Sequence, residues 1–400
     1  MGPSSERKLV ATSVELIAAN QVSSGAYVAA PGYDTYAYCW LRDGAFIASA
    51  MDACGRRESA TAFHRWVART VEAYGHKVRR LEATAGERSA VGPLGLRPLS
   101  DAEGLHTRFG LEGEEAQESW GNVQLDGYGY WLTSLSEHLA AHDADPAPFV
   151  GAVDLIRRYL CLTWDRPCYD CWEEYPTRRH PTTWAAVARG LVATAEIGSD
   201  SGATEVGELI ARRLRTETRP NHVLRKFVDD PWTDAEGAPS PSDDRPRDVA
   251  VAGHERVGRR LAADAVDGSA LLVLGPFGPF GLDDPIVGAT LDAVGSTLVA
   301  DGGVHRYLED DYYGGGLWVV LAGALAISIA DRDPDRSADV LRWIEAQAAD
   351  DGTLPEQVAS HLRQPAMYRP WVKRWGQPAR PLLWSHAMYL LGVAAVDGSD

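Results

Sequence analysis

Apolar residues recur every three or four positions along most of this chain, the spacing that gathers them on one face of an α-helix. The segment at 5–21 shows the pattern, because a serine suited to N-capping precedes apolar side chains at positions 9, 10, 14, 16, 17 and 18. The segment at 44–75 predicts two helices separated by a turn near Gly55. Further helices are expected in the stretches with the same periodicity: 126–142, 146–164, 182–198, 203–218, 284–300, 316–331, 336–348 and 381–396.

These helices predict an all-α protein. Strand-like alternation is sparse, and the best short strand candidate is RPNHVLRKFVDD at 219–230. The residue types able to perform chemistry lie in the connecting stretches YAYCWLRDG, ESWGN, YDCWEEYP, HRYLEDDYYGG and GTLPEQ. Helix pairs arranged around a closed ring would bring such loops together on one face of a rigid scaffold.

The segment at 229–256 interrupts the helical pattern. It is rich in Pro, Asp and Arg and has no periodicity, which indicates a long loop or excursion. A linker between two domains is the alternative. Because helical periodicity resumes in the same style after this segment, we expect residues 1–400 to form a single domain.

Charge limits the partners that this protein can have. Its composition is that of a globular chain, 45% hydrophobic and 24% charged, with a net charge of −17. An acidic protein is a poor match for nucleic acid or an anionic membrane, whereas neutral small molecules are compatible with it. No signal peptide and no membrane-spanning stretch are evident, so we expect a cytoplasmic protein. The oligomeric state is not indicated.

The cysteines indicate reduced thiols. Five are present, an odd number in a chain without a visible secretion signal, and they are Cys39, Cys54, Cys161, Cys168 and Cys171. The CYDC stretch at 168–171 offers a possible zinc or redox motif. A second such pair, or two histidines at ligand spacing, is missing. We therefore expect buried thiols, no metal and no cofactor, with a redox role for this pair as an alternative.

Aromatic residues lie beside charged residues in the connecting stretches. Aromatic faces stack on the C–H faces of sugars, while carboxylates and guanidinium groups bind hydroxyls. Any single ring could instead fill the core at a helix end, but the set as a whole favours a carbohydrate pocket. Its aromatic members are Tyr36, Tyr38, Trp40, Trp120, Trp172, Tyr312, Tyr313 and Trp318, and its charged members are Arg42, Asp43, Arg306 and Asp310.

Two carboxyl groups from distant loops predict the chemistry. Glu173 and Glu174 follow Trp172 directly, and Asp170 lies close by, so crowding and desolvation should raise a carboxyl pKa here. Glu356 lies in a short turn ahead of a predicted helix, where a glutamate alone would be a weak signal. Glycoside hydrolysis needs one protonated and one ionised carboxyl group, which this pair could supply.

The loops resemble those of glycoside hydrolase family 15, the glucoamylase-like family. Seven stretches match in order: YAYCWLRDG, ESWGNVQLDGYGYWL, YDCWEEYP, DGSALLVLGPFGPFGLDDP, HRYLEDDYYGGGLWVV, GTLPEQ and PLLWSHAMYLL. They span the chain from near residue 30 to residue 395. The resemblance implies an (α/α)6 barrel, inverting hydrolysis and release of β-glucose from non-reducing ends.

The same resemblance assigns residue roles. It makes Glu173 the general acid and Glu356 the general base. It places the remaining matched residues around the sugar: Tyr36 near the attacking water, Arg42 and Asp43 of the W-x-R-D motif on the terminal glucose, Arg306 and Glu174 near the cleavage point, Trp120 and Trp318 as wall aromatics, and Asp170 as an acidic neighbour of the acid. Trp40 and Trp172, which adjoin these residues, are further candidates for sugar binding. Inversion predicts that the two carboxyls lie roughly 6.5–9.5 Å apart.

The expected substrate is a short α-glucoside. Other members of the resembling family carry extra domains, and none is visible here, which favours isomaltose and isomalto-oligosaccharides with α-1,6 linkages. Trehalose and malto-oligosaccharides are the alternatives. From another class, a non-catalytic carbohydrate-binding or regulatory protein on the same scaffold remains possible, although such a protein would be expected to lose one of its two carboxylates.

Overall fold

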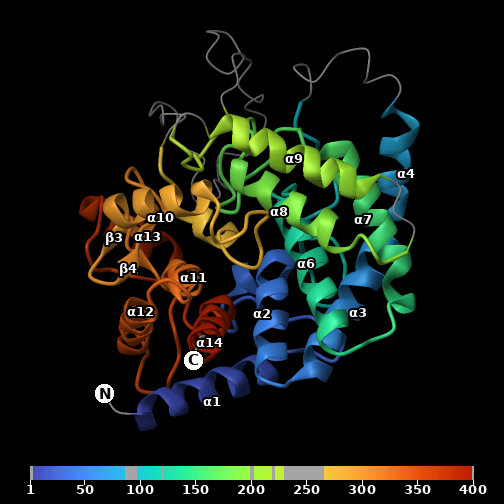
Figure 1. The fold of residues 1–400 in the computed structure, drawn as a ribbon. Helices are drawn as coiled ribbons and strands as arrows, with labels where there is room; N and C mark the ends of the chain where they lie inside the picture. The colour runs from blue at the N-terminus through green and yellow to red at the C-terminus, as the bar shows by residue number, and fades with distance from the viewer. Residues whose placement is uncertain are drawn as a thin grey trace.

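The structure is a computed structural model that describes residues 3–85, 97–118, 120–198, 202–218, 221–228 and 265–398. Helices dominate these residues and form two concentric layers around one centre (Figure 1). Along the chain, outer and inner elements alternate. The segment 229–256, expected to be a long loop, lies outside the described residues.

Six elements form the inner layer. Each packs against the next, and the last packs against the first, so the layer closes into a ring. This closure confirms the predicted (α/α)6 barrel. In order around the ring the elements are α2 (Leu41–Ala53), α6 (Asp126–Ala141), α8 (Pro181–Ala193), the 3-10 helix η4 (Gly268–Val273), α11 (Val319–Ile329) and α14 (Leu383–Asp397).

The outer layer covers this ring. Its helices are α1 (Pro3–Ala19), α3 (Arg57–Ala73), α7 (Val150–Thr163), α9 (Ala203–Glu217), α10 (Pro285–Thr297) and α12 (Pro334–Ala346). Whether a helix lies in the outer or the inner layer follows from how many of its faces are apolar. In outer α9 only Ala203, Gly207, Ile210 and Leu214 are buried, one stripe at helical spacing. In inner α11 every residue except Ile327 is buried. None of the described helices combines the length and apolar character needed to cross a membrane.

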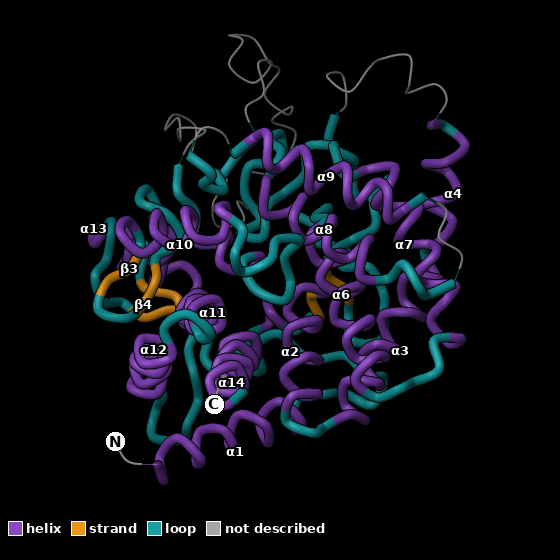
Figure 2. Tube along the Cα trace, in the orientation of Figure 1, coloured by secondary structure: helices purple, strands orange, loops and turns teal. Residues whose placement is uncertain are grey.

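Small sheets and short helices complete the fold. Strand β1 (Cys39–Trp40) pairs with β2 (Arg108–Phe109), and β3 (Val299–Ala300), β4 (Gly303–Val304), β5 (Leu317–Trp318) and β6 (Gln357–Val358) form an antiparallel sheet in that order. Helices α4 (Gly75–Ala83) and α13 (Pro365–Trp375) and the 3-10 helices η1 (Asp34–Tyr36), η3 (Ala147–Phe149) and η5 (Tyr312–Gly314) complete the described elements. Strands β3 and β4 and helix α13 lie on the side of the barrel near α10, and α4 lies on the opposite side (Figure 2).

Two sequence predictions need correction. The strand expected at 219–230 is absent from its described part, since residues 221–228 form turns, bends and irregular chain. The helix expected at 316–331 begins only at Val319, because Leu317 and Trp318 pair with β4 and β6. Strands β1 and β5 therefore lead directly into inner helices α2 and α11 and fix the loops in front of them.

Glycine allows the closest approach in the inner ring. Gly129 of α6 and Gly190 of α8 face each other, and a Cβ placed on Gly190 would lie 2.5 Å from the Gly129 carbonyl oxygen. Any side chain at either position would push the two helices apart. This contact holds α6 close to α8 and supports the tight closure of the ring.

Two kinds of polar side chain lie in the core. Cys168 and Cys171 are buried, as expected for the CYDC stretch, and so is Cys39, whereas Cys54 and Cys161 are half-buried. His386 is a core histidine with both ring nitrogens bonded, since Nδ1 lies 2.8 Å from Ser13 Oγ and the Leu354 backbone N–H donates to Nε2 at 2.9 Å. It therefore holds α1 and the Leu354 loop against α14.

Candidate active site

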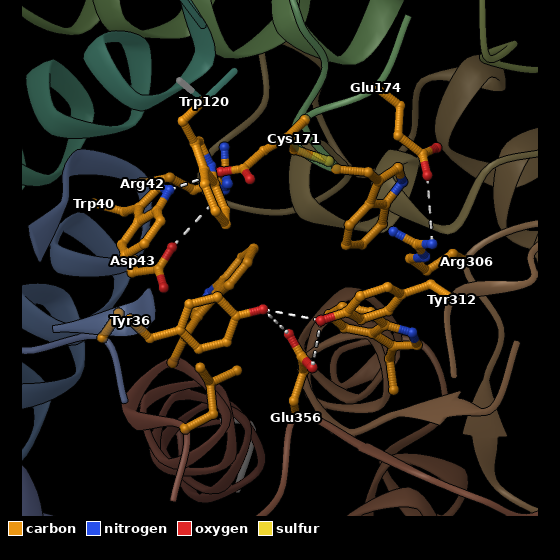
Figure 3. Close-up of a pocket in the computed structure, with 16 residues that line it drawn as sticks. Tyr36, Trp40, Arg42, Asp43, Trp120, Cys171, Glu174, Arg306, Tyr312 and Glu356 are labelled. Atoms are coloured by element: carbon orange, nitrogen blue, oxygen red, sulfur yellow. Dashed lines mark hydrogen bonds and ion pairs between the residues drawn. The ribbon is translucent and has the colours of Figure 1, made fainter. Parts of the chain in front are cut away.

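One cavity lies at the end of the ring where the inner helices α2, α11 and α14 begin. Figure 3 shows the labelled side chains arranged around a common central space, with Glu356 at its lower edge. All the predicted catalytic and sugar-binding residues line the cavity except Asp170, whereas Tyr38, Tyr313 and Asp310 of the wider aromatic and charged set do not. Its lining consists of Ala29, Tyr36, Trp40, Arg42, Asp43, Trp120, Cys171, Trp172, Glu173, Glu174, Arg306, Tyr312, Trp318, Glu356, Leu382 and Trp384.

The Glu173 side chain is half-buried, and its carboxyl accepts hydrogen bonds on Oε1. Trp40 Nε1 donates to Glu173 Oε1 at 2.8 Å, and Gln124 Nε2 donates to the same oxygen at 3.3 Å. Within the described part of the chain, Oε2 has no such donor. Burial raises the pKa of Glu173, while Arg42 and the Trp40 hydrogen bond oppose the increase. The group can therefore hold a proton on Oε2, facing the cavity.

The backbone at Glu173 is strained. Its φ of 65° lies in the left-handed region, which is rare for residues other than glycine. The Glu173 N–H donates to the Asp170 carbonyl at 3.0 Å, and the Asp170 N–H donates to the Glu174 carbonyl at 3.1 Å, so residues 170–174 form a tight turn. Backbone strain of this kind gathers at functional sites, where the surroundings hold it in place.

The two acidic neighbours of Glu173 do not crowd it as the sequence suggested. Tyr307 OH donates to Glu174 Oε2 at 2.7 Å, and Glu174 Oε1 lies 3.5 Å from Arg306 Nη2. Asp170 Oδ1 accepts the backbone N–H groups of Trp172 and Glu174 at 3.0 and 2.8 Å. Both carboxylates are thus engaged elsewhere, and burial is the main cause of the raised pKa at Glu173.

Glu356 is held by two tyrosine hydroxyls. Tyr36 OH donates to Oε1 at 3.2 Å and Tyr312 OH to Oε2 at 3.3 Å, and the two hydroxyls lie 2.9 Å apart (Figure 3). Burial raises the pKa of Glu356 to about 7, against the opposing effects of Arg306 and the two hydroxyls. A base with this pKa changes charge near neutrality, where general-base catalysis is most effective.

Arg42 and Asp43 come from the first turn of α2. Arg42 Nη1 donates to Gln124 Oε1 at 2.7 Å and to Asp126 Oδ2 at 2.9 Å, which fixes the guanidinium under the cavity. Burial raises the pKa of Asp43 to about 7, although Arg42 opposes this. Neither Gln124 nor Asp126 was identified from the sequence as part of the site, and only the structure shows that they orient these side chains.

Arg306 is fixed by a carboxylate and surrounded by aromatic rings. Its Nε and Nη2 donate to Asp310 at 2.9 and 2.5 Å, a two-point contact that holds the guanidinium plane. The guanidinium carbon lies 5.3 Å from the ring centre of Trp172 and 5.2 Å from that of Trp318. A fixed positive charge therefore borders the cavity near Glu356.

Comparison with known proteins decides the family. Residues 4–344 match the family model described as "Glycosyl hydrolases family 15". The chain belongs to glycosyl hydrolase family 15. Over 378 residues this family 15 chain is 38% identical to an isomaltose glucohydrolase of Kribbella flavida, covering 94% of this chain and 89% of that protein. A trehalase of Mycolicibacterium smegmatis is 25% identical over 69% of this chain, which spans only 37% of that protein.

Solved structures agree with this assignment. A glycosidase solved as the wild type is similar with a TM-score of 0.82 and 34% identity, covering 98% of this chain and 97% of that chain. A variant solved as a glycosidase in complex with glucose gives a TM-score of 0.83 at the same identity and coverage. A bacterial glucoamylase complexed with acarbose, at 20% identity and a TM-score of 0.66, shares the fold. The protein is a glycoside hydrolase.

The family match ends at residue 344, before Glu356. It is the cavity that brings Glu356 together with Glu173, although the two lie in separate loops far apart in the sequence. The cavity of this family 15 hydrolase also contains two aromatic side chains to which the sequence assigned no individual role. Tyr312 belonged to the wider aromatic set, and Trp384 lies in the matched stretch PLLWSHAMYLL, of which no residue was assigned to the site.

The described residues contain one group of side chains that could hold a metal ion. It consists of Asp52, His138 and His142. His138 Nδ1 and His142 Nε2 lie 2.7 and 3.0 Å from the two Asp52 oxygens, so the three side chains already satisfy one another. They come from the C-terminal ends of α2 and α6 and the loop beyond α6, whereas the cavity lies at the start of α2. This group therefore has no part in the chemistry of the cavity.

Proposed function

We propose that this family 15 hydrolase releases β-glucose from the non-reducing end of short α-glucosides, with isomaltose and other α-1,6-linked sugars preferred. The observation that carries the proposal is the 38% identity to an isomaltose glucohydrolase over nearly the full length of both chains. A cavity containing one carboxyl suited to donating a proton and another suited to accepting one supports the chemistry.

Glu173 acts as the general acid in this proposal. Its two hydrogen-bond donors both bind Oε1, so the proton resides on Oε2 and is transferred to the glycosidic oxygen as the bond to C1 breaks. After the transfer Glu173 is ionised. The hydrogen bonds from Trp40 and Gln124, together with the Arg42 charge, then stabilise the carboxylate.

Glu356 acts as the general base. Its carboxylate removes a proton from a water molecule while the water oxygen bonds to C1 on the face opposite the leaving group. Inversion at C1 converts the α-glucoside to β-glucose and leaves the proton on Glu356. Tyr36 and Tyr312 hydrogen-bond both of its oxygens, so they orient the carboxylate toward the water. The two carboxyls of an inverting enzyme stand roughly 6.5–9.5 Å apart to admit that water.

The leaving-group sugar would occupy a second hollow next to the cavity. The two share Tyr36, Trp120 and Tyr312, and the hollow is completed by Tyr313 and by α13 residues, among which is Trp371. Trp371 packs against Tyr312 with ring centres 5.0 Å apart. Aromatic rings at this position can stack on the second glucose of a disaccharide, which supports a preference for short substrates.

The test measures glucose release from isomaltose, maltose, trehalose, panose and dextran while NMR follows the anomer of the fresh product. We expect rapid release of β-glucose from isomaltose and little release from dextran. Initial α-glucose would contradict inversion. Faster hydrolysis of trehalose or maltose would move the substrate assignment to those sugars, and binding without hydrolysis of any sugar would indicate a carbohydrate-binding protein.

A further inference from the structure

Lys226 is a buried lysine behind the active-site loop. Its side chain is 1% exposed, and it does not line the cavity. Its Nζ donates to Asp267 Oδ2 at 2.5 Å and to Asp170 Oδ2 at 3.2 Å, and lies 4.3 Å from the centre of the Tyr307 ring. A lysine is buried in this way only when its charge is paired.

The two aspartates that share Lys226 both bind the loop that carries Glu173. Asp170 Oδ1 accepts the backbone N–H groups of Trp172 and Glu174, on either side of Glu173. Asp267 Oδ1 accepts the indole N–H of Trp172 at 2.9 Å. One cation therefore connects two carboxylates, and the carboxylates hold three donors of the same short loop.

We infer that Lys226 is a positioning residue for proton donation by Glu173, acting through Asp170 and Asp267. The inference deepens the proposed function and rests on it. An ionised Asp170 can accept both backbone N–H groups, and this keeps Glu173 in its left-handed conformation. Without the cation, the buried Asp170 carboxylate would lose the charge that pairs with it, and the turn around Glu173 would loosen.

A purely structural role is the competing explanation. Removal of one partner from a buried ion pair commonly destabilises a protein whatever the pair does. Loss of folded protein lowers hydrolysis of every substrate by the same factor. Loss of acid positioning lowers it only where the leaving group needs a proton. The two explanations therefore differ in how the loss depends on the leaving group.

The experiment compares isomaltose with α-glucosyl fluoride, whose fluoride leaves with little help from an acid. Lys226→Met should lower kcat for isomaltose about 10–100-fold, a substantial part of what general acid catalysis contributes, and kcat for the fluoride less than about 3-fold. Lys77→Met is the matched control, because Lys77 is also a buried lysine paired with a carboxylate, Glu115, at 2.5 Å, in another part of the fold. In Lys77→Met, kcat for isomaltose and kcat for the fluoride should fall by the same factor.

A second variant covers the case in which Lys226→Met does not fold. The double change Lys226→Met with Asp267→Asn removes one charge of each sign, so the net charge of the buried group is unchanged, and the new amide oxygen can still accept the Trp172 indole N–H. We expect this variant to fold and to retain the selective loss on isomaltose.

The outcomes separate the inference from the function on which it rests. Equal losses on both substrates, in either folded variant of an active enzyme, overturn the inference alone. A wild-type protein that hydrolyses neither compound overturns the proposed function and the inference with it. A selective loss on isomaltose that Lys77→Met does not reproduce supports both.

Discussion

The two carboxyl groups of the cavity are held in different ways. Glu173 lies in a strained turn whose geometry depends on buried ion pairs behind it. Glu356 instead directly precedes strand β6, and among the described residues the hydroxyls of Tyr36 and Tyr312 are the groups that hydrogen-bond its oxygens. Both residues have backbone and side-chain hydrogen bonds, but only the turn of the acid is held by carboxylates that are themselves in buried ion pairs.

This difference affects how each group titrates. Burial raises the pKa of both, but Glu173 receives two N–H donors on one oxygen and has Arg42 nearby, whereas Glu356 receives one hydroxyl donor on each oxygen and has Arg306 nearby. The pKa of Glu356 therefore depends on a few groups that single substitutions can remove. In one cavity, the acid is thus held in a fixed turn, whereas the pKa of the base can be changed by replacing a single neighbour.

The largest expected effect is the loss of turnover when either carboxyl is removed. The two losses should depend differently on the leaving group of the substrate. Glu173→Gln should lower turnover of isomaltose about 10³-fold, within the range that general acid catalysis contributes, but spare α-glucosyl fluoride, which needs no proton. Glu356→Gln should abolish turnover of both substrates, since each requires the attacking water to be deprotonated. Steady-state kcat on the two substrates provides the measurement. A Glu173→Gln variant that loses both equally would show that Glu173 is not the acid.

The second prediction concerns stability and its sign. Because burial raises the pKa of Glu356 from 4.5 to about 7, the folded state favours the protonated form, and the free energy of unfolding decreases as pH rises between these values. Glu356→Gln does not titrate. Its stability relative to the wild type should therefore increase from pH 4 to pH 8 by up to about 3 kcal/mol. Urea denaturation at both pH values measures this change.

A half-buried carboxylate whose pKa is shifted in the opposite direction provides the control. The hydrogen bond from Arg97 lowers the pKa of Glu103 to about 2. Glu103→Gln should therefore lose stability relative to the wild type as pH rises from about 2 to 4.5, and should change no further between pH 5 and 8. A constant difference between Glu356→Gln and the wild type across pH 4–8 would show that Glu356 is not buried as the structure indicates.

Local pattern predicted the helices well but missed one inner element. The fourth position of the ring is the short η4 at Gly268–Val273, for which the sequence offered no helical period. Gly275, Pro276 and Gly278 follow it closely, and such residues end a helix before amphipathic spacing can appear. The ring closes there through packing against α8 and α11, which periodicity cannot show.

The residues that line the cavity were predicted largely from the loop motifs. The buried ion pairs behind the Glu173 loop were not predicted. Glu173, Glu356 and Arg306 were found because motif and chemistry coincide there. Lys226 was read instead as part of a strand, because RPNHVLRKFVDD alternates. Its partners Asp170 and Asp267 are 56 and 41 residues away in the sequence, so only the folded structure shows that a charge is buried there.

A smaller effect is expected at the hydroxyl that binds the base. The hydrogen bond from Tyr36 lowers the pKa of Glu356, so Tyr36→Phe should raise that pKa. Since the base must be ionised, the acidic limb of the kcat/KM profile should move to higher pH, and kcat should fall about 10-fold through loss of a hydrogen bond to a charged group. Tyr38→Phe is the control, because the Tyr38 hydroxyl binds Glu118 instead. An unmoved limb in Tyr36→Phe would contradict the contact.

The smallest effect concerns the hollow beside the cavity. Trp371 of α13 borders it and packs against Tyr312, so Trp371→Ala should raise KM for isomaltose by about 3–10-fold, the worth of one aromatic contact. α-Glucosyl fluoride has no second sugar, and its kcat/KM should hardly change. Met367→Ala, at an exposed position of the same helix, is the control. Equal losses on both substrates would mean that Trp371 acts through Tyr312 on the base. In that case the base, like the acid, would depend on residues outside the cavity, and the contrast between the two carboxyls would narrow.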